Sequence, residues 1–263
     1  MHDWGQGVFE SLRCYKGEFF LLEEHLDRLF ASAHSLGWIL PYDRAEVVRR
    51  MKEDFAQQKE KSAFVRVTLY RDWEQERYDL ATTIIPMKRY LQTYYNEGVT
   101  LATVPTRRNS PMGVSPQVKS NNSLGGIFAL EEGRTQDIFE PLLLNDQGYV
   151  TEGTICNFFI VKRNKIMTSP VYTGLLEGVT RDQVIGLAKG EGFAVEEIPL
   201  TRHDIYTADE SFLTNTSMGV MPVRKVDGRD IGMETPGKTT KYLMKRLEEE
   251  IQAWEKRVNN DQN

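Results

Sequence analysis

The stretch VTEGTICNFFIVKRNKIMT, residues 150–168, contains three short runs of strand-forming residues separated by turns. The runs at 150–152, 156–162 and 165–168 are rich in β-branched, aromatic and other apolar residues, which favour strands. Arg163 and Asn164 supply a turn between the second and third runs. The stretch therefore predicts consecutive strands in a β-rich part of the chain.

Strand and helix patterns continue on both sides of this stretch. Before it we expect strands at 99–104 and 140–144, with an irregular, proline-containing segment at 105–118 and a helix at 123–133 between them. After it we expect a helix at 180–190, strands at 194–198, 211–214 and 220–223, and a charged amphipathic helix at 236–254.

The first ninety residues have a mixed pattern of their own. Strands at 8–15 and 18–22 surround a Lys16-Gly17 turn, and two amphipathic helices precede strands at 63–70 and 80–85. We therefore predict an α+β chain, mixed α/β in character, with two domains. The small domain spans 1–91, a linker spans 92–98, and the large domain spans 99–263.

The composition excludes several classes of protein. The chain has 263 residues with Lys+Arg 33 and Asp+Glu 38, a net charge of −5, which argues against nucleic acid as the main partner. No window approaches the roughly 18 consecutive apolar residues of a membrane span. The two cysteines, Cys14 and Cys156, fit a reducing compartment, and we expect a cytoplasmic protein. Four scattered histidines form no metal-binding pair, so we expect no metal site.

Four features could carry chemistry, and each also has a structural explanation. Lys119 lies between the proline-containing segment and a helix, where a lysine is usually solvated. Glu152 lies at a strand end and could be a turn residue. Residues 176–181 begin a helix whose N–H groups can bind an anion or only water and a cap. Residues 214–217, Thr-Asn-Thr-Ser, can line a site or form a structural turn.

Together, these features supply a reactive amine, a carboxylate between strands and two segments suited to a phosphate. Pyridoxal 5'-phosphate requires this set: the amine forms the Schiff base, the carboxylate keeps the ring nitrogen protonated, and the two segments bind the phosphate. We therefore expect pyridoxal 5'-phosphate as the cofactor.

Six stretches, in order, resemble the motifs of the class IV (fold-type IV) pyridoxal-phosphate enzymes. This family contains branched-chain aminotransferase, D-amino-acid aminotransferase and aminodeoxychorismate lyase. The stretches are GQGVFESLR at 5–13, EHLDRL at 24–29, VKSNN at 118–122, TEGT at 151–154 with NFF at 157–159, LEGVTR at 176–181 and FLTNTSMGVMPV at 212–223. The resemblance covers nearly the whole chain and implies a small α/β domain and a larger domain with a mixed, barrel-like sheet.

The resemblance implies roles for the cofactor-binding residues. Lys119 would be the Schiff-base lysine and the catalytic base, and Glu152 would pair with the ring nitrogen. Leu176 would lie against the ring. The phosphate would be bound by Arg28, Val179, Thr180 and Thr216. The alternative for Arg28 is a surface pair with Glu24, one helical turn before it.

The same resemblance suggests residues that contact the substrate. They are the backbone N–H of Ser217, together with Arg66, Phe9, Trp4, Phe64 and Arg77. For Arg66 the alternative is a strand arginine that reaches solvent. Phe64 stands where branched-chain enzymes often have a tyrosine. Arg77 with Tyr78 resembles a carboxylate motif of the lyases, without its flanking glycines.

From these residues we expect ping-pong transamination of a branched-chain L-amino acid with 2-oxoglutarate, because Phe9, Trp4, Phe64 and Met218 are apolar. Three alternatives stay open: 4-amino-4-deoxychorismate lyase, D-amino-acid aminotransferase, and a non-catalytic or weakly active homologue. The resemblance also implies a homodimer. Relatives usually carry roughly thirty residues before the first motif, including a strand that covers a sheet edge. We therefore expect a small-domain sheet that lacks one strand.

Overall fold

The computed structural model describes residues 7–72, 76–87 and 90–261. The chain divides into two compact units. The first comprises Met1–Lys88, Val118–Ser123 and Ile251–Asn263, and the second comprises Arg89–Gln117 and Leu124–Glu250. Two short segments from later in the chain therefore belong to the N-terminal unit, and one of them carries Lys119.

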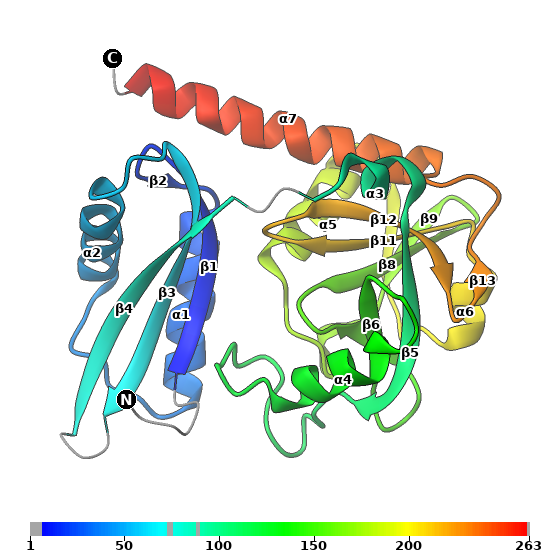
Figure 1. Ribbon diagram of the computed structural model, residues 1–263, viewed down its shortest axis with the longest axis horizontal. Coiled ribbons are helices and arrows are strands. Elements are labelled where there is room, and N and C mark those ends of the chain that lie inside the picture. Colours follow the sequence, from blue (N-terminus) through cyan, green and yellow to red (C-terminus); the bar gives the residue numbers. More distant parts are fainter. Residues whose placement is uncertain (1–6, 73–75, 88–89, 262–263) are drawn as a thin grey trace. The chain divides into compact units, whose positions relative to one another are not determined.

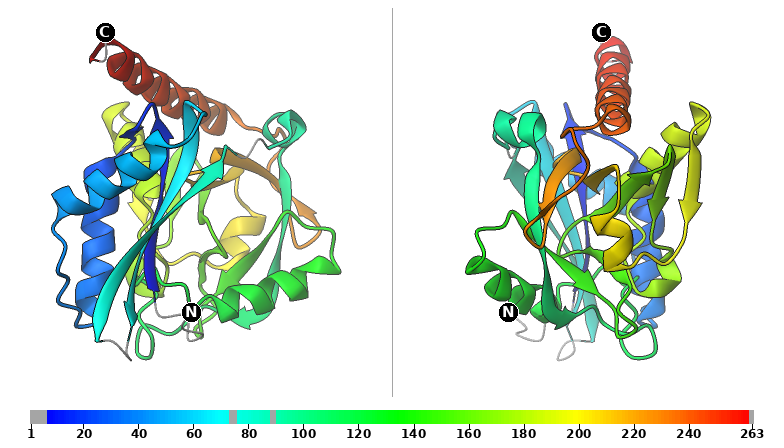
Figure 2. Two further views of the ribbon diagram at one scale, coloured as in Figure 1. Left: turned by 60° about the vertical axis from the view of Figure 1, so that its left-hand side comes forward. Right: turned by 90° about the vertical axis from the view of Figure 1, so that its right-hand side faces the viewer.

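The first unit contains a four-stranded antiparallel sheet in the order β2-β1-β3-β4, with two helices on one face (Figures 1 and 2). The elements are β1 (Gly7–Tyr15), β2 (Glu18–Phe19), α1 (Leu22–Ser35), α2 (Arg44–Ala56), β3 (Ser62–Asp72) and β4 (Arg77–Pro86). Along β1, Val8, Glu10, Leu12 and Cys14 are fully buried and alternate with half-buried residues. This alternation separates a helix-covered face from a second face that carries Phe9.

The edge of β1 is paired at both of its ends. Tyr15 and its neighbour pair with β2, while Val8 forms an antiparallel bridge with Ser120. The expectation of a sheet that lacks one strand stays a prediction. The structure shows, however, that residues around Lys119 cover the β1 edge next to Gly7.

The boundary between the units differs from the one expected. Residues Gln92–Glu97, expected as a linker, form helix α3 inside the second unit. The C-terminal helix α7 (Lys238–Asp261) is longer than expected, and its end belongs to the first unit. Trp254 explains this assignment, because its ring centroid lies 5.3 Å from that of Phe20 and 6.3 Å from that of Tyr15.

The second unit is built around a nine-stranded sheet in the order β10-β9-β8-β11-β12-β5-β6-β7, to which β13 adds. Because β7 also pairs with β8, six of the strands close into a barrel. The strands are β5 (Val99–Arg107), β6 (Glu140–Leu144), β7 (Val150–Gly153), β8 (Asn157–Lys162), β9 (Lys165–Thr168), β10 (Ala194–Glu197), β11 (Glu210–Asn215), β12 (Gly219–Val226) and β13 (Arg229–Asp230). The predicted barrel-like mixed sheet is confirmed.

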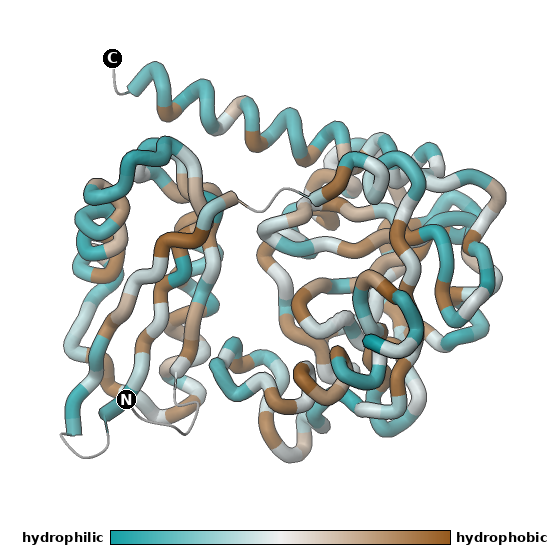
Figure 3. The backbone as a smooth tube through the Cα atoms, in the orientation of Figure 1, coloured by the Kyte–Doolittle hydropathy of each residue, from teal (hydrophilic) through white to brown (hydrophobic). Residues whose placement is uncertain are grey.

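Alternate strand residues form the core of the second unit, among them Phe158, Leu213 and Met221. The remaining elements are α4 (Leu124–Arg134), the short helix η1 (Val171–Thr173), α5 (Val179–Gly190) and α6 (Arg202–Tyr206). Figure 3 shows hydrophobic positions concentrated in the strands and recurring along the otherwise hydrophilic α7. None of the helices in the described residues combines the length and the hydrophobicity that crossing a membrane would need.

Candidate active site

Lys119 lies along the edge of β1 in the first unit. The N–H of Phe9 donates to the carbonyl of Lys119 at 2.9 Å, and the N–H of Lys119 donates to the hydroxyl of Ser32 on α1 at 3.2 Å. Val8 and Ser120 are register partners beside this contact. The backbone of Lys119 is thus fixed as a short antiparallel addition to the sheet, and its side chain lies on the same face as Phe9.

The ring of Phe9 contacts two cations. The guanidinium carbon of Arg66 lies 3.6 Å from the ring centroid, and Lys119 Nζ lies 4.9 Å from it. Arg66 Nη2 donates to Asn121 Oδ1 at 3.1 Å, and burial lowers the pKa of the guanidinium. The first unit therefore brings together three predicted residues, Lys119, Phe9 and Arg66. Arg66 is half-buried and does not simply extend into solvent.

Arg28 is held by a buried carboxylate. Its Nε donates to Glu10 Oε1 at 2.6 Å and its Nη2 to Oε2 at 2.8 Å, while His25 Nδ1 lies 2.7 Å from Oε2. Burial alone would raise the pKa of Glu10, but the hydrogen bonds from Arg28 and His25 lower it to about 2. Burial lowers the pKa of His25. Two parallel bonds fix the plane of the guanidinium, so Arg28 is oriented by Glu10 and not by Glu24.

Phe64, Arg77 and Trp4 complete the set expected in this unit. Phe64 is 4% exposed and lies two residues before Arg66, on the same face of β3. Arg77 begins β4 and forms an ion pair with Asp79 at 3.1 Å. Arg77 stands six positions before Thr83, the register partner of Arg66, which is about 20 Å along β4, so the two arginines are not neighbours. Trp4 lies outside the described residues.

Glu152 is a buried strand residue of the second unit, 5% exposed, and is not a solvated turn residue. Its Oε1 accepts from the N–H of Leu176 at 3.1 Å and lies 2.7 Å from Arg108 Nε. Its Oε2 accepts from Asn157 Nδ2 at 3.3 Å. Two hydrogen-bond donors and one cation, from three separate segments, therefore surround this carboxylate.

The N-terminus of α5 matches the predicted phosphate-binding segment. No side chain of the described residues caps this helix, and its first backbone bond runs from the N–H of Asp182 to the carbonyl of Gly178 at 2.9 Å. The N–H groups of Val179 and Thr180 therefore have no partner within the helix, and the helix dipole favours an anion there. Gly178 is required by packing, because a Cβ at this position would collide with Asn157 Oδ1.

Glu152, Asn157 and Thr214 form a row of register partners across β7, β8 and β11. Register partners direct their side chains to the same face of a sheet. Thr214 is 0% exposed, and its hydroxyl has no hydrogen-bond partner among the described residues. Thr216 follows two residues later, just after β11 ends. The row connects the predicted carboxylate with the predicted phosphate-binding loop.

The loop after β11 is organised by Asn215. Its Oδ1 accepts from the N–H of Ser217 at 2.9 Å and from the N–H of Met218 at 2.8 Å. The hydroxyl of Ser217 lies 3.0 Å from the hydroxyl of Tyr90. The N–H of Ser217, which we expected to bind a substrate carboxylate, is therefore engaged within its own loop.

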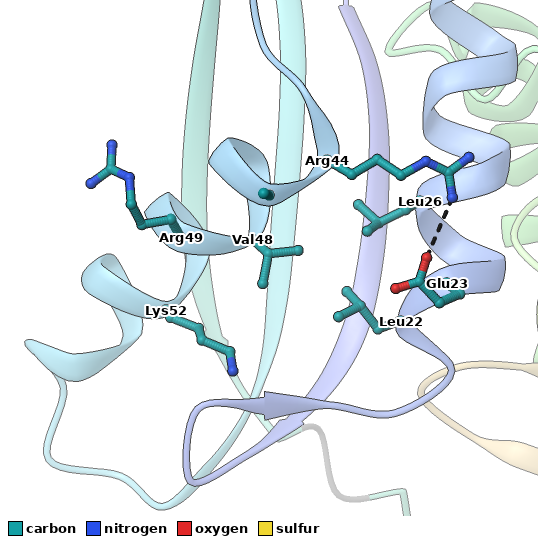
Figure 4. A pocket seen from close by; sticks show the side chains of 8 residues that line it. Leu22, Glu23, Leu26, Arg44, Val48, Arg49 and Lys52 are labelled. Carbon is teal, nitrogen blue, oxygen red and sulfur yellow. Dashed lines mark hydrogen bonds and ion pairs between the residues drawn. The ribbon is translucent and has the colours of Figure 1, made fainter.

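A groove between α1 and α2 is unrelated to these residues (Figure 4). It is lined by Leu22, Glu23, Leu26, Arg44, Ala45, Val48, Arg49 and Lys52. Its cations are already paired: Arg44 with Asp27 at 2.6 Å, for example, and Lys52 with Glu18 at 2.6 Å. Because these charges are neutralised, the groove is not the anion-binding site.

The residues present fit pyridoxal 5'-phosphate. A lysine amine lies beside an aromatic ring, a buried carboxylate is firmly oriented, and an uncapped helix N-terminus can receive a phosphate. The buried hydroxyl of Thr214, which has no partner in the described part of the chain, indicates a further polar contact for a bound molecule. Fold and donor set together define a pyridoxal-phosphate enzyme.

Residues 7–226 match the family described as Amino-transferase class IV, and the chain belongs to this family. Class IV aminotransferases are pyridoxal-phosphate-dependent enzymes, and the chain is accordingly an aminotransferase.

Two relatives cover most of the chain. A Methanocaldococcus jannaschii protein, provisionally named a branched-chain-amino-acid aminotransferase, is 38% identical over 95% of this chain and 89% of its own length. The D-alanine aminotransferase of Bacillus licheniformis is 33% identical, with the same coverage of 95% and 89%. A crystal structure of the branched-chain aminotransferase of the thermophilic archaeon Thermoproteus uzoniensis with norvaline has a TM-score of 0.86 and 31% identity, covering 94% of this chain and 85% of that one.

Sequence reasoning did not identify several residues of the site. Glu10, His25, Arg108, Asn157 and Thr214 all contact or adjoin the predicted residues. Glu10 did carry a signal, because it is a charged residue in phase with the buried positions of β1. Arg108 carried none, since an arginine in an irregular segment is ordinarily solvated.

Proposed function

We propose that this aminotransferase transfers the amino group of a branched-chain L-amino acid to 2-oxoglutarate. The observation that carries the proposal is the arrangement around Phe9. Its apolar ring lies against Lys119 Nζ, which suits an aliphatic side chain near the reacting amine. The guanidinium of Arg66 on the same ring suits a carboxylate. The names of the Methanocaldococcus jannaschii relative and of the Thermoproteus uzoniensis enzyme support this substrate class.

The chain's own residues divide the work of the reaction. When bound, pyridoxal 5'-phosphate supplies an aldehyde that captures the amino group and a ring that withdraws electrons from the substrate Cα. Lys119 is the residue that takes the proton from Cα and returns it during the transfer. Glu152 keeps the ring nitrogen protonated.

The phosphate is a dianion and needs donors and positive charge. Arg28 provides a guanidinium whose plane is fixed by Glu10, and Val179 and Thr180 provide backbone N–H groups at the start of α5. Thr216 adds a donor from the loop after β11. Leu176 would lie against the ring, because its N–H binds Glu152, the carboxylate assigned to the ring nitrogen.

We propose that the protein forms a homodimer through α4. On this helix Leu124, Ile127, Phe128 and Leu130 are 57%, 53%, 57% and 43% exposed. An exposed apolar helix face marks a protein–protein contact. Phe128→Asp is expected to convert the dimer to a monomer in light scattering, whereas Glu131→Gln on the same helix leaves the mass unchanged. A Phe128→Asp protein that stays dimeric would contradict this interface.

The two free, buried cysteines support the cytoplasm as the compartment of the protein.

A second candidate is D-amino-acid transamination, which the Bacillus licheniformis relative favours. One experiment separates the possibilities. The cofactor-loaded enzyme is mixed with L-Leu, D-Leu, D-Ala or 4-amino-4-deoxychorismate in the absence of an oxo acid, and the absorption of the bound cofactor is followed. If L-Leu undergoes a single turnover and the corresponding 2-oxo acid is released, the proposal is supported. Turnover with the D-amino acids alone, or release of pyruvate and 4-aminobenzoate, would replace it.

A matched pair of arginines tests the role assigned to Arg66. Arg66→Gln is expected to raise the KM for L-Leu at least tenfold, because the substrate carboxylate loses its cation. Arg13→Gln is the control, since Arg13 also lies over an aromatic ring, that of Phe64, at 5.6 Å. It stands four residues after Phe9 on β1, about 13 Å along the strand. Equal effects of the two substitutions would remove Arg66 from the substrate site.

A further inference from the structure

Arg108 is a charged residue whose side chain is largely buried next to Glu152. It follows β5 directly, and its N–H donates to the carbonyl of Leu144 at 2.9 Å, which fixes the backbone. Its Nε lies 2.7 Å from Glu152 Oε1, with the two side chains 25% and 7% exposed. Its Nη2 donates to the carbonyl of Pro116 at 3.3 Å. The guanidinium thus joins the carboxylate to the loop that ends three residues before Lys119.

The contact is electrostatic more than it is a directed hydrogen bond. The Nε–H of Arg108 has no hydrogen-bond partner among the described residues, although its nitrogen lies within ion-pair distance of the carboxylate. The neutral donors from Leu176 and Asn157 set the direction of Glu152, and Arg108 supplies positive charge. A nearby cation favours the ionised form of a buried carboxylate.

We propose that Arg108 is a positioning residue for Glu152. It keeps Glu152 ionised, so that the proton shared with the cofactor ring nitrogen resides on the ring and not on the carboxylate. Through Pro116, it also ties Glu152 to the segment that leads to Lys119. The inference rests on the cofactor assignment and is independent of which amino acid is the substrate.

The first test is the affinity of the apoenzyme for pyridoxal 5'-phosphate. Arg108→Gln is expected to weaken binding at least tenfold. Arg107→Gln is the matched control, because the adjacent Arg107 is exposed and its guanidinium donates to the carbonyls of Val104 and Pro105, both at 2.9 Å. Its dissociation constant should stay within twofold of that of the unmodified enzyme.

A double-substitution cycle shows whether Arg108 acts through Glu152. In a Glu152→Gln background, Arg108→Gln should change the dissociation constant less than twofold, because no carboxylate remains for the guanidinium to hold. The double variant removes both charges of this ion pair, so it leaves neither partner buried and unpaired. If the effects of the two substitutions on the dissociation constant multiply, the proposal is overturned. If Arg108→Gln alone does not fold, Arg108→Lys, which retains the charge, should bind the cofactor with an intermediate affinity, and binding equal to that of the unmodified enzyme would also overturn it.

The second readout is the protonation of the ring nitrogen, which a purely structural role would not move. With ¹⁵N-labelled pyridoxal 5'-phosphate bound, the ring ¹⁵N resonance of Arg108→Gln should shift toward that of the unprotonated ring. Arg107→Gln should give the resonance of the unmodified enzyme. An unshifted resonance in Arg108→Gln would refute the electrostatic role. Neither readout needs an amino acid, so failure here is separable from a wrong choice of substrate.

Discussion

Replacing Glu10 by Gln tests how much the buried Glu10–Arg28–His25 group contributes to the first unit. The carboxyl pKa of Glu10 is about 2 in the folded protein, against an ordinary value of 4.5. A difference of about 2.5 units corresponds to about 3 kcal/mol, because one unit is worth about 1.4 kcal/mol. We therefore expect Glu10→Gln to lower the free energy of unfolding at pH 7 by about 3 kcal/mol.

The pH dependence has a definite sign. Because the folded pKa of Glu10 is depressed, its contribution is complete above about pH 4.5 and is lost as the pH falls toward 2. At pH 3.5 the gap between the two proteins should be smaller by about 1 kcal/mol. The pKa of His25 is also lowered, by burial, so the unfolded chain binds a proton below pH 6.5 that the folded protein excludes. Because Glu10 raises the pKa of His25, the resulting loss of stability differs between the two proteins, so the narrowing due to Glu10 is measured with His25→Gln present in both.

Urea unfolding followed by tryptophan fluorescence measures this unit selectively. All four tryptophans fall within the residue ranges of the first unit, and the two that the structure describes, Trp38 and Trp254, pack there. Glu18→Gln is the matched control: Glu18 pairs with Lys52 at 2.6 Å, but both side chains are 41% exposed, so the loss should stay below about 1 kcal/mol. The reasoning is refuted if Glu10→Gln costs no more than Glu18→Gln, or if the gap is the same at pH 7 and pH 3.5.

Three further predictions concern the second unit. Thr214→Val should raise the free energy of unfolding of the apoenzyme by about 1 kcal/mol, because it removes a buried hydroxyl that has no partner among the described residues. The same substitution should weaken cofactor binding. A destabilised apoenzyme in calorimetry would contradict this prediction. Gly178→Ala must displace Asn157 and should weaken cofactor binding at least tenfold by titration, while unchanged affinity would show that Asn157 has room to move. Glu210→Gln should lower the free energy of unfolding by about 1 kcal/mol, because Glu210 accepts from the N–H of Thr240 at 2.7 Å and so caps α7. Urea unfolding followed by circular dichroism measures this loss. An unchanged free energy would mean that water replaces the cap.

Much of the fold follows from local patterns. The expected helix at 180–190 is α5, and the strands of the opening stretch are β7, β8 and β9. Periodicity predicts these elements well because it depends on neighbours a few residues apart. It did not predict that Gln92–Glu97 is a helix, or that α7 continues past Trp254 to Asp261. That last extension depends on the rings of Phe20 and Tyr15, more than 200 residues earlier in the chain.

The site residues divide in the same way. The roles proposed for Lys119, Glu152 and the N-terminus of α5 rest on short motifs, because a strand end or a helix start is a local property of the chain. Arg77 shows the limit of this reasoning, since a motif-like residue at the start of β4 lies well away from Arg66 along the strand. Only strand register decides such distances.

By itself, the sequence determined the enzyme class, the cofactor and the succession of most helices and strands, since each is encoded in contiguous residues. The tertiary structure alone decided which groups hold those residues in place. Glu10 orients Arg28, Arg108 lies against Glu152, and Thr214 joins the row that begins at Glu152. The physical reason is that these contacts are set by strand register and side-chain burial. Local periodicity assigns a residue to a face but does not choose its partner across the sheet.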